Sequence, residues 1–89
     1  MDLKALRDEL DTIDSKLLAL YLRRMSVVRE VAEFKIENNL PVLHPGREAE
    51  ILAWAEQEAG EEMAPYALRF FRELLAGSRA LQESLMAQL

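Results

Sequence analysis

The N-terminal part of the chain carries an uninterrupted helical pattern. Apolar residues recur at alternating spacings of three and four from Leu3 to Phe34, which is typical of one face of a helix. No Gly or Pro interrupts this stretch. The Asn-Asn-Leu-Pro sequence at 38–41 ends it, because Asn suits a helix end and a proline disfavours helical backbone at the residue before it. We therefore predict one long helix over residues 3–38.

Two shorter helices are predicted in the remainder of the chain. Proline and glycine residues mark a loop over 40–46. A second helix is expected from about 46 to 59, because a proline suits its first turn and Gly60 is a natural stop. After a polar turn at 61–62, Pro65 opens a third helix that keeps helical spacing to the C-terminus. With no alternating strand pattern, the fold class is all-α, with three helices.

The length of the first helix predicts an obligate homodimer. A helix of this size is about 52 Å long at 1.5 Å per residue, whereas a compact domain of 89 residues is roughly 30 Å across. The helix would project beyond its own chain, and its apolar stripe would be exposed unless a second chain covers it.

Composition narrows the class of protein. The 89 residues are expected to form one domain, 1–89. With no Cys and one His, thiolate and multi-His metal sites are excluded and no metal is expected. The net charge of −5 argues against binding to nucleic acid or anionic membranes. Charged residues interrupt the N-terminus, and no apolar run reaches membrane-spanning length, so we expect a cytoplasmic protein.

Two cations on the first helix are the strongest candidates for chemistry. Arg24 is the one charged residue on the apolar stripe, and arginine is suited to binding carboxylates or phosphates. Lys35 lies three turns later, about 16 Å along the axis and only about 20° around it, so the two side chains can hold one small anion. Alternatively, Arg24 pairs with Asp11 or Asp14 of a partner chain and Lys35 is solvated.

Further polar residues have equally open interpretations. Arg7 lies roughly 25 Å from Arg24 along the same helix, so it can reach such a site only in another chain. Taken by itself, Arg7 is interpreted as a solvated surface side chain. Arg47 and Glu48 begin the second helix, where an acid compensates the helix dipole. In the third helix, Ser78 and Gln82 share a face and suit either ligand binding or interhelical packing. His44 suits a helix cap.

In their order and spacing these residues resemble the all-α chorismate mutases. The elements that carry the resemblance are Leu6-Arg7, residues 14–20, Arg23-Arg24, residues 35–42, Arg47-Glu48 and the Ser78…Gln82 pair. The resemblance covers nearly the whole chain. It implies an intertwined dimer that rearranges chorismate to prephenate within one molecule, without cofactor, covalent intermediate or proton transfer.

The resemblance also implies a role for each candidate. Arg24 and the partner subunit's Arg7 would hold the two carboxylates of chorismate, with Arg47 and Ser78 assisting. Lys35 and Gln82 would donate hydrogen bonds to the ether oxygen, and Glu48 would accept one from the ring hydroxyl. The apolar wall of the site would be formed by Val31, Ile51 and Leu75. One position departs from the family pattern: His44 stands where the family often has Asp, and we expect this difference to have a modest effect, on the contact with the ring hydroxyl.

Two other functions compete with this interpretation. An isochorismate-pyruvate lyase resembles the same fold and cationic pocket, although Glu48 and Ser78 favour the mutase. A non-catalytic dimerisation or regulatory module is the alternative from a different class, since some mutase-like domains control the enzyme that starts the shikimate pathway. A working mutase can also associate with a shikimate-pathway enzyme.

Overall fold

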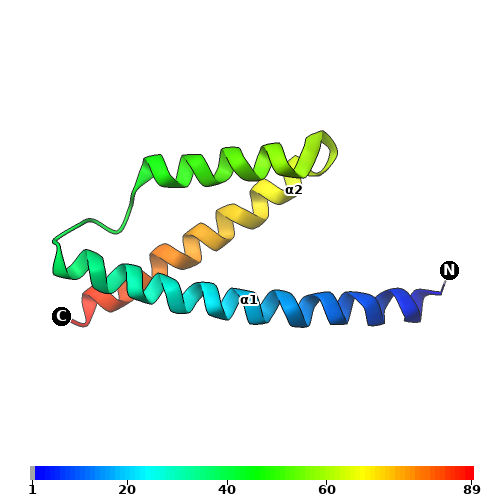
Figure 1. Ribbon diagram of the computed structural model, residues 1–89, viewed down its shortest axis with the longest axis horizontal. Helices are drawn as coiled ribbons and strands as arrows, with labels where there is room; N and C mark the ends of the chain where they lie inside the picture. The colour runs from blue at the N-terminus through cyan, green and yellow to red at the C-terminus, as the bar shows by residue number, and fades with distance from the viewer. Residues whose placement is uncertain (1) are drawn as a thin grey trace.

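The computed structural model describes residues 2–89, and every regular element in that range is helical (Figure 1). Helix α1 spans Leu3–Glu37 and helix α2 spans Pro45–Ala87. The all-α class is confirmed. The predicted bounds of the first helix are correct to within one residue, because Asn38 is its C-cap.

Local hydrogen bonds fix both ends of α1 and the start of α2. The Asp2 side chain accepts from the Lys4 backbone N–H at 3.0 Å, satisfying a donor that the first turn leaves free. At the other end, Asn39 has a φ of 55°, in the left-handed region that asparagine tolerates. Helix α2 then begins at Pro45, where His44 Nδ1 accepts from the Arg47 backbone N–H at 2.9 Å.

The structure has two helical elements rather than the predicted three, because the second and third run together as α2. The predicted stop at Gly60 is confirmed, since Gly60 is the non-helical residue at the bend of this element. A single residue makes the bend: Gly60 has φ 81° and ψ 165°, a conformation open essentially to glycine alone. The polar turn predicted at 61–62 is absent, because these two residues are helical. Pro65 therefore lies inside α2 rather than at the start of a separate helix. The first arm of α2 is residues 45–59 and the second arm is residues 61–87.

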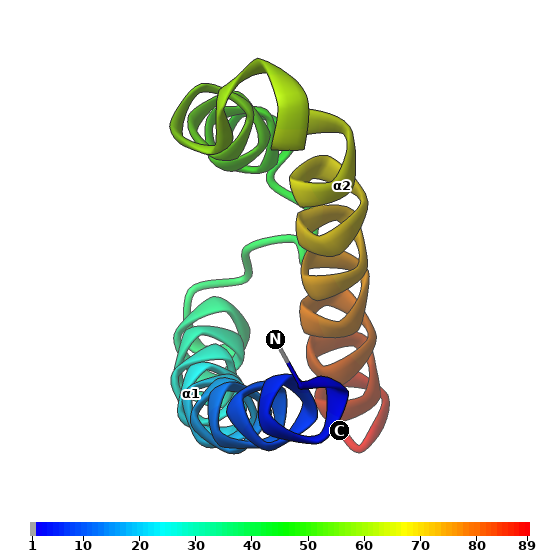
Figure 2. The same ribbon diagram turned by 90° about the vertical axis from the view of Figure 1, so that its right-hand side faces the viewer.

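The three straight segments form an open, elongated arrangement. The second arm returns to the C-terminal half of α1, whereas the first arm lies apart from α1, and the N-terminal half of α1 extends alone (Figures 1 and 2). The molecule measures 54 × 26 × 14 Å with a radius of gyration of 16.2 Å, against about 12 Å for a compact chain of this length.

Very few apolar side chains are buried in this arrangement. Among the described residues, the buried apolar ones are Ala32, Ala55 and Leu75. Large apolar residues of the α1 stripe are exposed instead, including Leu10, Ile13 and Leu20. The chain therefore leaves uncovered an apolar face of a kind that monomers rarely expose. No helix in residues 2–89 is long and apolar enough to cross a membrane.

Candidate active site

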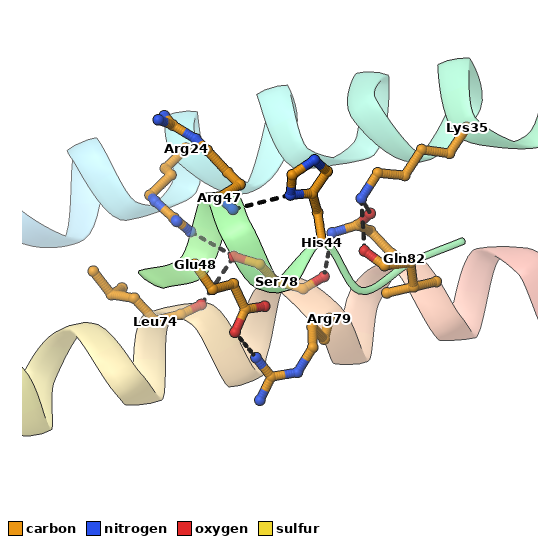
Figure 3. Close-up of polar contacts among 10 residues, drawn as sticks. Arg24, Lys35, His44, Arg47, Glu48, Leu74, Ser78, Arg79 and Gln82 are labelled. Carbon is orange, nitrogen blue, oxygen red and sulfur yellow. Dashed lines mark hydrogen bonds and ion pairs between the residues drawn. The ribbon is translucent and has the colours of Figure 1, made fainter. Parts of the chain in front are cut away.

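One cavity of about 500 Å³ lies between the C-terminal half of α1, the start of α2 and the second arm. It collects every expected site residue except Arg7. The expected residues that line it are Arg24, Val31, Lys35, His44, Arg47, Glu48, Ile51, Leu75, Ser78 and Gln82. They come from three segments that are distant in sequence, and Figure 3 shows α1 on one side, the second arm on the other and the start of α2 between them.

Arg24 is held by the second arm of α2. Its Nη1 donates to Ser78 Oγ at 2.5 Å, and Ser78 Oγ donates in turn to the Leu74 carbonyl at 2.9 Å (Figure 3). Ser78 is buried. No carboxylate within residues 2–89 forms an ion pair with Arg24. The guanidinium is thus fixed in direction while its charge stays available to an anion.

Lys35 is oriented by two acceptors. Its Nζ donates to the Val42 carbonyl at 2.7 Å and to Gln82 Oε1 at 2.9 Å. Gln82 is buried, and its Nε2 donates to the Ser78 carbonyl at 3.3 Å. An ammonium group carries three donors, so one N–H of Lys35 remains for a ligand. Within the described chain no carboxylate pairs with this charge either.

The first turn of α2 presents a cap, a cation and a carboxylate to the cavity. His44 lines the cavity and also caps the helix through Nδ1. Arg47 lies at the edge, with 67% of its side chain exposed, and pairs with Glu50 at 3.5 Å; such exposed pairs are weak, so its guanidinium is free to exchange partners. Glu48 lies deeper, at 22% exposure.

Arg79 is a cavity residue that the sequence analysis missed. Its Nη1 donates to Glu48 Oε1 at 2.5 Å across the space between the two arms (Figure 3). One sequence signal points to it: it lies three residues before Gln82, and residues at that spacing share a helix face.

Arg7 is not brought to the cavity. It is exposed on the N-terminal half of α1 and is not among the residues that line the cavity. Seventeen residues of helix separate it from Arg24, about 25 Å along the axis. Within one chain these two arginines cannot contact the same small molecule.

The charges around the cavity are mostly positive. Although the chain has a net charge of −5, the cavity is lined by one carboxylate, that of Glu48, and by five cationic side chains among residues 2–89. These cations are Arg23, Arg24, Lys35, Arg47 and Arg79. Fixed donors surround a mostly apolar hollow with Val31, Ile51 and Leu75 in its wall. The fold and this cavity are those of an all-helical protein with a cationic hollow suited to a small organic anion.

Comparison with known proteins identifies the family. Residues 6–83 match the family described as chorismate mutase type II, and the chain belongs to it. It is 45% identical over 58 residues to a protein named T-protein from Enterobacter agglomerans. It is also 28% identical over 88 residues to a chorismate mutase from Methanocaldococcus jannaschii, covering 97% of this chain and 89% of that protein.

A third relative has two functions in its name. The bifunctional chorismate mutase/prephenate dehydratase of Aquifex aeolicus is 42% identical over 50 residues. The matches cover 65% and 56% of this chain for the T-protein and the bifunctional enzyme, but only 16% and 14% of those two proteins. No solved structure matches the chain significantly.

Proposed function

We propose that the chain catalyses the rearrangement of chorismate to prephenate. The observation that carries the proposal is the pair of unneutralised cations, Arg24 and Lys35, each fixed by a hydrogen bond from α1 to the second arm and each facing one cavity. Family membership supports the same activity. Chorismate is a small dicarboxylate, which is the class of ligand that such a cavity attracts.

The carboxylates of the substrate would be held at the Arg24 end of the cavity. Arg24 and Ser78 provide fixed donors there, and Arg47 can leave its exposed partner Glu50 to bind a ligand. A substrate fixed at both carboxylates is restricted to the compact conformer in which the enolpyruvyl carbon lies over the ring. That restriction removes much of the barrier to an intramolecular reaction.

The breaking bond would lie at the Lys35 end. One C–O ether bond breaks as one C–C bond forms, and negative charge grows on the ether oxygen in the transition state. The unused N–H of Lys35 and the second N–H of the Gln82 amide are the donors that would stabilise this charge. The electrons move within the substrate, so no nucleophile, proton carrier or cofactor takes part.

We further propose that the active protein is an intertwined homodimer with one residue of each site supplied across chains. The accessible surface of one chain is 7134 Å², whereas a monomer of this mass has about 5,300 Å². The exposed apolar residues of the α1 stripe contribute to this excess. Covering the stripe with a second chain would allow the partner subunit's Arg7 to complete the carboxylate site that Arg24 begins.

The proposed product, prephenate, points to a metabolic pathway for the protein. Prephenate is the substrate that the name of the Aquifex aeolicus relative assigns to its dehydratase activity. We propose that this chain acts in aromatic amino-acid biosynthesis in the cytoplasm, beside an enzyme of the shikimate pathway or one that consumes prephenate.

Product identification tests the activity directly. The purified protein is incubated with chorismate and, separately, with isochorismate, and the products are separated by chromatography. Prephenate from chorismate supports the mutase. Pyruvate and salicylate from isochorismate alone would replace it with a lyase. If neither substrate reacts while the protein stays folded, the site binds its ligand without catalysis, and a ligand-dependent rise in melting temperature would then detect binding.

A further inference from the structure

The Glu48–Arg79 pair differs from every other cationic contact in the cavity. Arg24 and Lys35 donate to neutral acceptors, and Arg47 pairs with a carboxylate at the exposed edge. Arg79 instead bonds a partly buried carboxylate, with 33% and 22% of the two side chains exposed. Its charge is already offset by Glu48, so Arg79 is poorly suited to anchor a substrate carboxylate.

The contact uses only one oxygen of the carboxylate. Arg79 Nη1 donates to Glu48 Oε1, and among residues 2–89 Glu48 Oε2 has no hydrogen-bond partner. An ionised carboxylate has about four acceptor sites on its two oxygens. The second oxygen is therefore free to accept a hydrogen bond from a hydroxyl group in the cavity.

The direction of Glu48 depends on this contact. Without Arg79, the carboxylate would share the cavity only with cations that have other roles, including Arg24 and Arg47, which are proposed to hold the substrate. Figure 3 shows Glu48 turned toward Arg79 on the second arm while Arg24 donates to Ser78. The pair thus separates the acceptor for a hydroxyl from the donors for carboxylates.

We propose that Arg79 is a positioning residue that orients the Glu48 carboxylate to accept the ring hydroxyl of the substrate. The inference rests on the proposed mutase function. Arg79 then acts on specificity: it makes the site prefer a cyclic dicarboxylate that bears a hydroxyl group over the same dicarboxylate without one.

The test compares two substrates in matched variants. Initial rates with chorismate and with an analogue that lacks the ring hydroxyl are measured for the wild type, Arg79→Leu, Arg79→Lys and the control Arg72→Leu. Arg72 lies on the same arm, two turns earlier, is exposed and does not line the cavity. Circular dichroism and dimer content are recorded for each variant, and Arg79→Lys provides a test if Arg79→Leu does not fold.

Arg79→Leu should lower kcat/KM for chorismate by about tenfold, the size expected when a hydrogen bond to a charged group is disturbed. It should leave kcat/KM for the analogue unchanged, because no hydroxyl is present for Glu48 to bind. Arg79→Lys should recover part of the loss, and Arg72→Leu should match the wild type on both substrates. In a Glu48→Gln background, Arg79→Leu should have little further effect, since the two residues act as one unit.

Four results would overturn the inference. Equal losses on both substrates would assign Arg79 to direct binding of the substrate or to folding alone. Additive losses in the Glu48→Gln background would separate Arg79 from Glu48. A wild-type protein with no activity on chorismate would remove the proposed function and this role with it, whereas an active wild type with an unaffected Arg79→Leu variant would remove only the role.

Discussion

Lys35 on α1 and Gln82 on α2 are 47 residues apart and joined by a hydrogen bond of 2.9 Å. The bond connects the end of the long helix to the last turns of the second arm, and it places an amide beside an ammonium group whose charge no carboxylate of residues 2–89 offsets. In the proposed mechanism, this ammonium group stabilises the negative charge that grows on the ether oxygen of the substrate.

Removal of the Lys35 ammonium should abolish most turnover. We expect Lys35→Ala to lower kcat by at least about 10²–10³-fold, because a donor to the developing oxyanion is lost together with its charge. Helix content and dimer content should not change. Lys4→Ala is the matched control, since Lys4 lies on the same helix with 82% of its side chain exposed. A Lys35→Ala variant with near wild-type kcat would exclude Lys35 from the mechanism.

Gln82→Glu should make the reaction depend on pH. When the new carboxyl is ionised, it offsets the charge of Lys35 and repels the oxygen on which negative charge grows. When it is protonated, it becomes a donor like the amide it replaces. Activity of the variant should therefore fall as the pH rises, while the wild type changes little over the same range. Parallel pH–rate profiles for the two proteins would contradict this role.

Subunit mixing should test whether one site is shared between chains. Arg7→Ala and Arg24→Ala should each lose nearly all activity as homodimers. After exchange, a heterodimer contains one site with both arginines mutated and one site with both intact, so the mixture should regain activity. Exchange is verified with differently tagged chains. Heterodimers that form but stay inactive would show that the two arginines do not serve the same site.

A charge on the apolar stripe of α1 should prevent dimer formation. Leu10→Glu places a carboxylate on the exposed stripe, where burial against a second chain would be costly. Thr12→Glu adds the same charge about 200° around the helix and should leave the dimer intact. Sedimentation velocity compares the two. If both variants keep the mass of the wild type, this stripe is not the interface.

The cap at His44 should contribute to stability and to substrate binding. His44→Ala removes the acceptor for the Arg47 N–H and should lower the free energy of unfolding by about 1 kcal/mol, a typical value for an N-cap side chain. KM should rise because Arg47 and Glu48 lie on the turn that the cap orders. His44→Asn keeps an acceptor and should restore both values. Denaturation at one fixed protein concentration measures the difference.

The sequence predicted the elements whose signals are local. The bounds of α1 follow from its stripe and from the residues at 38–41, and Arg24 was found because it interrupts an apolar face, with Lys35 three turns later on the same helix. The number of helices was not predicted correctly, because Gly60 reverses the chain with one residue and needs no separate turn. Arg79 was missed because its partner Glu48 is 31 residues away, and only the bend brings them together.

The bend at Gly60 also decides how accurately the cavity is assembled. About fourteen residues of helix separate it from the first turn of α2, a length of roughly 20 Å. At that radius a rotation of about 10° in one backbone torsion of Gly60 would move Glu48 by roughly 3 Å, more than the whole length of its bond to Arg79. No side chain crowds Gly60 to hold that torsion. Contacts between the two arms therefore hold the angle of the bend: the edge-to-face contact of Trp54 with Phe71 midway along the first arm, and the Glu48–Arg79 bond at its far end. The bond that orients the Glu48 carboxylate is thus also one of the contacts that hold the shape of the chain.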